Sequence, residues 1–154
     1  MSAVEERLAA LGHQVPEVAA PVASYVPAVH TGQHVFTSGQ LPFVEGRLLQ
    51  TGKVGGEVSA DEATACAEVC ALNAIAAVRG VVGDLDRVTR IVKATVFVAS
   101  TPDFTQQPQV ANGASELFAA AFGAVGQHAR SAVGVPVLPL DSPVEVEVVV
   151  EVGP

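Results

Sequence analysis

The sequence predicts an α+β domain in which one mixed sheet carries two helices on one face. After a short N-terminal helix, the expected order is strand, strand, short strand, helix, long strand, helix, strand, strand. The last strand alternates valine with glutamate almost perfectly, as in a sheet with one buried and one open face. Residues 1–154 contain no repeat, low-complexity tract or linker, so we expect a single domain.

The first 27 residues are predicted to hold a helix and an extended segment. A helix is expected over residues 2–11, where an apolar stripe runs up to a terminating Gly12. Residues 14–27 contain three prolines, which exclude helix and favour extended or turn backbone. This segment carries Tyr25, the only tyrosine of the chain.

The middle of the chain predicts a hairpin, a helix and a long strand. Two short strands within residues 28–39 form the hairpin, and a further short strand is expected at residues 47–50. Ser59 opens a capping box with a glutamate three residues on, which predicts a helix over residues 59–79, ended by glycines 80 and 83. Residues 87–99 are apolar on both faces, which indicates a central strand covered on both sides.

The last third predicts a second helix and two closing strands. The helix lies within residues 103–123, and its regular part is expected to begin near Gln109, because Pro108 would interrupt it. The closing strands are residues 128–138 and 144–152, and we expect the residues between them to form a hairpin loop.

The sheet face opposite the helices is expected to be an association surface. Two helices cover only one face of a sheet whose long strand is apolar on both sides, so we predict a homo-oligomer with packed sheets. The closing-strand residues expected on this open face are Arg130, Ala132, Gly134, Glu145, Glu147, Val149 and Glu151.

Composition narrows the classes of function. The net charge is −8 and the eight lysines and arginines are scattered, whereas nucleic-acid binding needs a clustered basic surface. The chain opens on acidic, amphipathic residues rather than a signal peptide, and we expect no apolar run of membrane-spanning length. Cys66 and Cys70 lack further ligands at metal-site spacing and are expected to be buried free thiols. We therefore expect a cytoplasmic protein without metal, other cofactor, nucleic-acid partner or membrane partner.

Arg130 is the first candidate for chemistry, because it is the only cationic side chain after Lys93. Its planar guanidinium can bind a carboxylate through two parallel hydrogen bonds; a structural ion pair with a glutamate of the last strand is the alternative. Glu145 is a candidate general base or water-orienting group, although the repeated glutamates on its strand also fit a solvated face.

His128, Tyr25 and Ser38 are three further candidate site residues. His128 titrates near neutrality and suits a proton shuttle, but it equally suits a contact at the end of the second helix. Tyr25 fits either a cover over a bound ligand or core packing. Ser38 lacks the motif of a nucleophile elbow and is interpreted as a hydrogen-bond donor to a ligand.

The predicted closing hairpin constrains any site that uses both charged candidates. It would pair Val137 with Glu145 and leave Arg130 seven residues back, roughly 23 Å away at about 3.3 Å per residue. Arg130 and Glu145 would then meet only across a subunit interface, so an enzyme that uses both requires an oligomer.

Several motifs occur in the order known from one protein family. They are Tyr25-Val-Pro, Val35-Phe-Thr-Ser-Gly-Gln-Leu-Pro42, Leu85-Asp-Arg-Val with Thr95-Val-Phe-Val98, Asp103-Phe, Asn112 with Glu116, Ala129-Arg-Ser131, and the final Leu-Pro and Val-Glu-Val-Glu segments. With these motifs the chain resembles the Rid/YjgF superfamily of reactive-intermediate deaminases, also labelled "endoribonuclease L-PSP". The segments Gly52-Lys-Val-Gly, Asn112-Gly-Ala-Ser and His128-Ala-Arg-Ser-Ala-Val-Gly resemble a subgroup of longer members.

The resemblance implies a chorismate-mutase-like fold and a homotrimer with three clefts between subunits. In the deaminating branch, an arginine holds the carboxylate of a 2-imino or 2-enamino acid, and water hydrolyses this substrate to a 2-keto acid and ammonia. By this resemblance the arginine is Arg130, the water-orienting glutamate is Glu145, and Tyr25, Ser38 and Asn112 contact the substrate.

Two positions depart from the family pattern. Ala132 stands where a cysteine is often found, and His128 stands where Phe or Pro is often found. Two functions are therefore kept as alternatives: a cofactor-independent hydrolase of small imine or enamine acids, and a non-catalytic trimer that binds small carboxylates or keto acids as a sensor or chaperone-like partner. Both need Arg130, whereas only the enzyme needs Glu145, Tyr25 and His128. The acidic charge argues against a ribonuclease.

Overall fold

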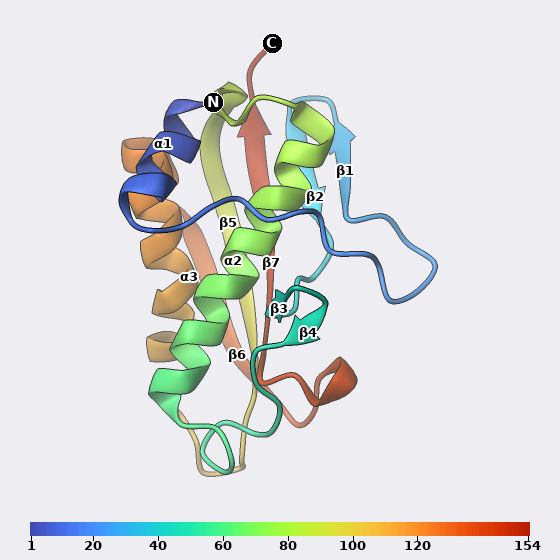
Figure 1. The fold of residues 1–154 in the computed structure, drawn as a ribbon. Coiled ribbons are helices and arrows are strands. Elements are labelled where there is room, and N and C mark those ends of the chain that lie inside the picture. Colours follow the sequence, from blue (N-terminus) through green and yellow to red (C-terminus); the bar gives the residue numbers. More distant parts are fainter.

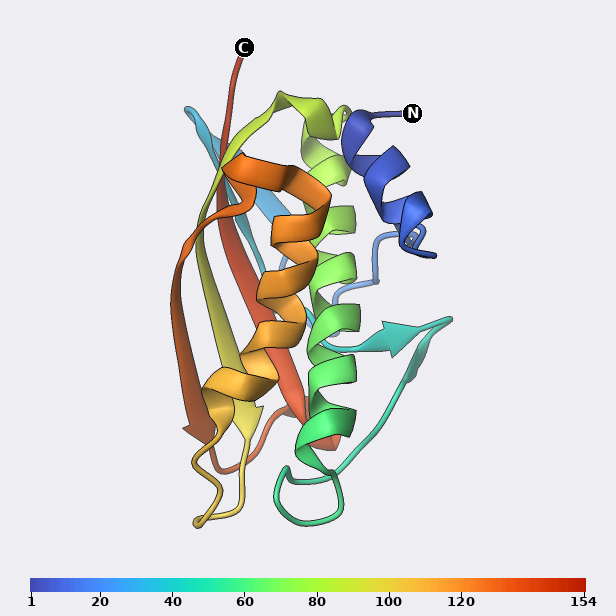
Figure 2. The ribbon, with the colours of Figure 1, turned by 90° about the vertical axis from the view of Figure 1, so that its left-hand side faces the viewer.

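The computed structural model describes all 154 residues and shows a mixed sheet with helices on one face (Figure 1, Figure 2). The sheet strands are β1 (Ala28–Thr31), β2 (His34–Thr37), β5 (Val88–Ala99), β6 (Ala129–Val135) and β7 (Val144–Val152). The remaining elements are the small hairpin β3 (Phe43–Val44) and β4 (Arg47–Leu48) and the helices α1 (Ala3–Ala10), α2 (Ala60–Val82) and α3 (Gln107–Phe122). The predicted α+β class is confirmed, and the sheet order is β1-β2-β7-β5-β6.

Helix α2 begins where its capping signal predicts. The Ser59 hydroxyl accepts the backbone N–H of Glu62 at 3.1 Å, and the Glu62 carboxylate accepts the backbone N–H of Ser59 at 3.1 Å. The helix runs through Gly80, contrary to expectation, and ends at Gly83, whose φ of 79° suits a residue without a Cβ atom. Its small apolar residues form the centre of a core shared by the sheet and α3.

The apolar length of α2 differs from the sequence-based expectation. An 18-residue window of this helix has a mean hydropathy of 1.6, which together with its length is enough for a membrane span. However, 61% of the window is buried inside the fold, between the sheet and the other helices (Figure 2). The apolar character of α2 is therefore explained by its position as the core helix.

Helix α3 begins at Gln107, two residues before the predicted start. Pro108 lies in its first turn, where a backbone N–H has no partner in the helix, so proline is tolerated there. Gly113 has a role in packing, because a Cβ atom at this position would lie 2.1 Å from the Thr64 carbonyl oxygen of α2. The two helices can approach each other closely only with glycine at this point.

The predicted hairpin between the two closing strands is wrong. Strand β5 lies between them: β6 pairs with β5 in parallel, and β7 pairs with β5 and β2 in antiparallel orientation. The connection over residues 136–143 crosses the end of β5 and contains a 3-10 turn at Pro139–Asp141. A long strand such as β5 has two edges to pair, and each closing strand occupies one of them.

This topology also corrects which side chains face the open side of the sheet. Arg130, Ala132 and Gly134 of β6 lie level with buried residues of β5, so they face the helices and not the open side. Glu145, Glu147, Val149 and Glu151 of β7 face the open side, as predicted. Within one chain the helices cover one face of β5, and the expected cover of its other face by a second subunit stays a prediction.

The open face carries exposed apolar side chains. Val29 on β1 is 52% exposed, Phe36 on β2 is 47% exposed and Val133 on β6 is 43% exposed.

The predicted free, buried state of Cys66 and Cys70 is confirmed. Burial raises the pKa of the Cys66 thiol to about 11 and holds the pKa of the Cys70 thiol well above its ordinary value, so neither is a ready nucleophile.

Candidate functional site

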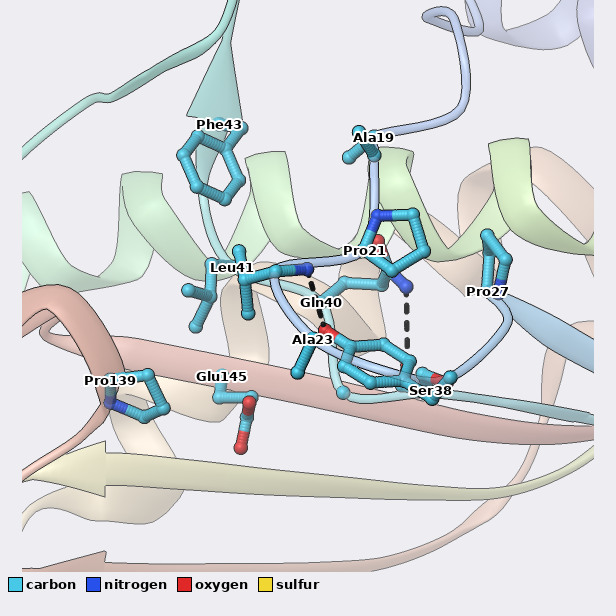
Figure 3. A pocket seen from close by; sticks show the side chains of 14 residues that line it. Ala19, Pro21, Ala23, Pro27, Ser38, Gln40, Leu41, Phe43, Pro139 and Glu145 are labelled. Carbon is cyan, nitrogen blue, oxygen red and sulfur yellow. Dashed lines mark hydrogen bonds between the residues drawn. The ribbon is translucent and has the colours of Figure 1, made fainter.

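A pocket of about 470 Å³ lies beside the end of β2 (Figure 3). Its walls come from the extended N-terminal segment, from residues 38–43 and from the start of β7. Three predicted site residues, Tyr25, Ser38 and Glu145, line it together. No lysine, arginine or histidine does so. The pocket is therefore mostly apolar, with one carboxyl group in its wall.

Glu145 is held in a partly buried position. Strand β7 directs it to the open face, where it approaches Gly39 so closely that a Cβ atom there would lie 2.6 Å from the Glu145 carboxyl carbon. Burial, and secondarily the charge of Glu147, raise the pKa of the Glu145 carboxyl above its ordinary value of 4.5. A carboxyl group with a raised pKa is a better proton acceptor near neutrality than an ordinary glutamate.

Ser38 and Tyr25 connect the N-terminal segment to the pocket. The Ser38 hydroxyl donates to the Val26 carbonyl at 2.6 Å, so its oxygen is left to accept a hydrogen bond. The Tyr25 side chain is 44% exposed, which favours the interpretation as a cover over the pocket and excludes core packing. Gln40 completes this wall: its backbone pairs with Val146 and its side chain donates to the Ser38 carbonyl at 3.3 Å.

Arg130 lies in a second cluster, between edge strand β6 and helix α3. One guanidinium nitrogen donates to Asn112 Oδ1 at 2.8 Å and to the Ser115 hydroxyl at 3.2 Å, and the other donates to the Pro108 carbonyl at 3.4 Å. None of the three ion pairs of the chain involves Arg130. The alternative of a structural pair with a glutamate of the last strand is therefore not realised, and the structure brings Asn112 to Arg130 instead.

His128 supports this second cluster. Its Nδ1 lies 2.6 Å from the Gly126 carbonyl oxygen, and its Nε2 lies 2.8 Å from the Ser115 hydroxyl. A carbonyl only accepts, so neutral His128 carries its proton on Nδ1 and Nε2 accepts from Ser115. Ser115 then accepts from Arg130, which fixes the direction of every hydrogen bond in the chain from Arg130 to Gly126. In this arrangement both ring nitrogens of His128 are occupied.

Ser115 is a site residue that sequence reasoning missed. It follows Asn112 by three residues on α3, so both side chains project from the same face of the helix. That spacing was a usable signal, but only once the helix was known to face Arg130.

The two clusters lie on opposite faces of the sheet. Arg130 faces the helices level with Ala94 and Val148, whereas Glu145 faces the open side three residues before Val148 on β7. Their Cα atoms are roughly 14 Å apart, from two strand spacings and three residue steps, rather than the 23 Å that the hairpin implied. With the sheet between them, the two side chains of one chain cannot contact the same small ligand. No group of three or more His, Cys, Asp or Glu residues is placed to hold a metal ion.

Known proteins with this fold and sequence pattern are similar over almost the whole chain. "Protein TCP17" of Trypanosoma cruzi is 45% identical over 151 residues, covering 97% of this chain and 94% of that protein. The crystal structure of protein Atu1372 from Agrobacterium tumefaciens, described as of unknown function, has a TM-score of 0.92 and 41% identity, over 98% of this chain and 94% of that one. E. coli TdcF, solved with bound serine, has a TM-score of 0.62 and 26% identity, over 90% and 94%.

These similarities agree with the motifs read from the sequence. Residues 5–152 match the family described as "YjgF/chorismate_mutase-like, putative endoribonuclease". The matched residues include all of the sheet, helices α2 and α3, most of α1 and both clusters of candidate site residues. The chain therefore belongs to the Rid/YjgF superfamily and has its chorismate-mutase-like fold.

Proposed function

We propose that this protein is a cofactor-independent hydrolase of small 2-imino and 2-enamino acids that works as a cytoplasmic homotrimer. The observation that carries the proposal is Glu145, a partly buried carboxyl group with a raised pKa in a pocket without a cation. Membership of the superfamily supports a role in binding small molecules. The serine bound to TdcF, an amino acid with a carboxylate, supports a ligand of this class.

We infer that the site is divided between two chains, and the fold supports this. Arg130 and Glu145 lie on opposite faces of one sheet, so a substrate that needs both must lie between neighbouring subunits. We assign Arg130, held by Asn112 and Ser115, to the substrate carboxylate. The neighbouring chain supplies Glu145, with Tyr25 as a cover and the Ser38 oxygen as an acceptor for the imine N–H.

The proposed reaction uses these groups in two steps. Glu145 takes a proton from water as the water oxygen bonds to C2 of the protonated imine, which gives a carbinolamine. Glu145 then returns the proton to nitrogen and the C–N bond breaks, so that ammonia leaves. The C2 hydroxyl gives its proton to the regenerated Glu145 carboxylate as the keto group forms. His128 acts through Ser115 on the orientation of Arg130, so we assign it a positioning role in place of the proton shuttle.

The reaction can be tested with imines made in place by an amino-acid oxidase. Unhydrolysed imine is trapped by semicarbazide, and the protein should lower the yield of semicarbazone for part of a broad amino-acid panel. An unchanged yield with every amino acid would reject the hydrolase. Ligand binding without turnover in the same panel would instead favour the non-catalytic carboxylate binder.

The role of Arg130 has its own test. Arg130→Ala should lower kcat/KM by roughly 100-fold, because two charge-assisted hydrogen bonds to the substrate are worth about 3 kcal/mol. Arg90→Ala is the matched control, since Arg90 is an exposed arginine that reaches only the Gln127 carbonyl at 3.4 Å. Equal rates for the two variants, with the assembly state unchanged, would refute the assignment of Arg130.

A further inference from the structure

A second cavity, of about 690 Å³, lies on the other side of the N-terminal segment from the candidate site. It is open to solvent on one side and is lined by the N-terminal segment, by α2 and by the β3–β4 hairpin, where the N-terminal segment crosses α2 (Figure 1). Its walls are largely apolar, with Val18, Phe43, Val69 and Leu72 among them. Neither Glu145 nor any residue of the Arg130 cluster lines it, so it is a separate site.

A buried acceptor faces into this cavity. Asn73 is only 2% exposed, and its amide nitrogen donates to the Leu41 carbonyl at 2.9 Å and to the Phe43 carbonyl at 3.1 Å. These two bonds fix the orientation of the amide, because a flipped amide would set its oxygen against two carbonyls. The oxygen accepts no hydrogen bond from the chain, and no buried side-chain oxygen of this protein is both unpaired and sealed from solvent. The Asn73 oxygen therefore opens onto the cavity that Asn73 lines.

The charge around the cavity has one sign. Glu17 and Glu45 line it, and no lysine, arginine or histidine does. Glu45 sits at the turn of the β3–β4 hairpin with a φ of 51°, a left-handed conformation that costs a non-glycine residue energy and that Asn or Gly adopts more readily. A carboxylate is thus present at a position where the backbone favours another residue.

We propose that this cavity binds a small apolar primary amine in its ammonium form. An ammonium group has three N–H donors, and the site offers the Asn73 oxygen with carboxylates at the rim. The apolar body of the ligand would replace water against Phe43, Val69 and Leu72. An anion would meet the two carboxylates without a compensating cation.

The test uses 2-phenylethylamine as the probe and 2-phenylethanol as its neutral counterpart. Binding is followed by ¹H–¹⁵N NMR of the full-length protein. The amine should shift the Asn73 side-chain amide and the amides of Val69 and Leu72 in a saturable way, and it should bind at least about tenfold tighter than the alcohol. Shifts centred on Tyr25 and Glu145 instead, or equal affinity for the alcohol, would overturn the proposal. Ala19, Ala20 and Phe43 line both cavities, so shifts of their amides do not tell the two cavities apart.

Two variants separate the cavity from the rest of the molecule. Val69→Phe should fill the cavity and abolish saturable binding. Glu45→Asn keeps the turn geometry and removes one rim charge, so it should weaken the amine by about fivefold, as expected for one partly screened charge, and leave the alcohol unchanged. Glu57→Gln is the matched control, since Glu57 does not line the cavity. Unchanged affinity in Glu45→Asn and in a folded Val69→Phe would reject the site.

Discussion

At the residue scale, Glu145 combines a chemical role with a cost to stability. Burial raises its pKa in the folded protein, so the folded state binds this proton more tightly than the unfolded state does. The stability that the protonated Glu145 carboxyl gives the folded state is fully present below the ordinary pKa of 4.5. It is lost as the pH rises through the raised pKa of the folded protein. At neutral pH, ionised Glu145 therefore lowers the free energy of unfolding. Such costs are common where chemistry requires a buried ionisable group.

Replacing this carboxyl should therefore separate activity from stability. Glu145→Gln keeps the shape of the side chain and removes the charge, so the melting temperature at pH 7 should rise by about 1–3 °C, while imine hydrolysis falls by roughly 100-fold or more. Calorimetry and the semicarbazone assay measure the two effects. Glu151→Gln on the same strand, outside the pocket, is the control and should leave the rate unchanged. A destabilised Glu145→Gln would contradict the pKa argument.

The neighbouring Glu147 offers a finer test of the same carboxyl. Its charge contributes to the raised pKa of Glu145, so Glu147→Gln should lower that pKa. If Glu145 is the base, the acid limb of the kcat/KM profile should move to lower pH, with little change on the plateau. A limb that stays in place would show that another group sets the acid dependence.

At the scale of elements, α1 packs Val4 and Leu8 into the core and is held in addition by ionic and capping hydrogen bonds. Ser2 and Glu5 form a reciprocal capping box, and the Glu5 carboxylate accepts from Arg79 of α2 at 2.7 Å. Asp86 caps the same helix by accepting the backbone N–H groups of Ala3 and Val4. The bond from the Ser2 backbone, followed by the Arg79 bond, lowers the pKa of Glu5 from 4.5 to about 2.

This low pKa gives the helix a defined acid sensitivity. The contribution of Glu5 is fully present above pH 4.5 and is lost as the pH falls through about 2. Glu5→Gln should cost about 1–2 kcal/mol of unfolding free energy at pH 7, after allowing for solvent screening of a partly exposed pair. The difference from wild type should vanish near pH 2. Denaturant titrations at pH 7, 4 and 2 measure it, and a constant difference across this range would exclude ionisation as its source.

At the scale of the whole molecule, local signals predicted the elements, and long-range pairing decided the site. The capping box at Ser59 and the valine–glutamate alternation of β7 depend on near neighbours, so the sequence was sufficient for them. The face on which Arg130 lies depends on its strand partner, and the sequence could not show that β5 inserts between β6 and β7. Ser115 and Asn73 acquire their importance only from contacts more than a dozen residues away in sequence.

The open sheet face should mediate the proposed trimer. Phe36 is 47% exposed at the centre of the apolar residues there, and it pairs with Val29 and Val149 on the adjacent strands. Phe36→Lys should dissociate the assembly into monomers and abolish hydrolysis with it, because Arg130 and Glu145 would no longer meet. Light scattering after size-exclusion chromatography measures the mass. Val81→Lys, an exposed apolar residue on α2, is the control and should remain assembled. A monomeric wild-type protein with full activity would refute the shared site.

The wall between the two cavities has a thermodynamic consequence. Ala19, Ala20 and Phe43 line both cavities, so a displacement of these residues that enlarges one cavity narrows the other. A ligand bound in one cavity then weakens the binding of a ligand in the other. This coupling is reciprocal, because each ligand lowers the affinity of the other by the same factor. A ligand in the second cavity would therefore change the apparent affinity of the candidate site for its substrate by the same factor as the substrate changes the affinity of the second cavity.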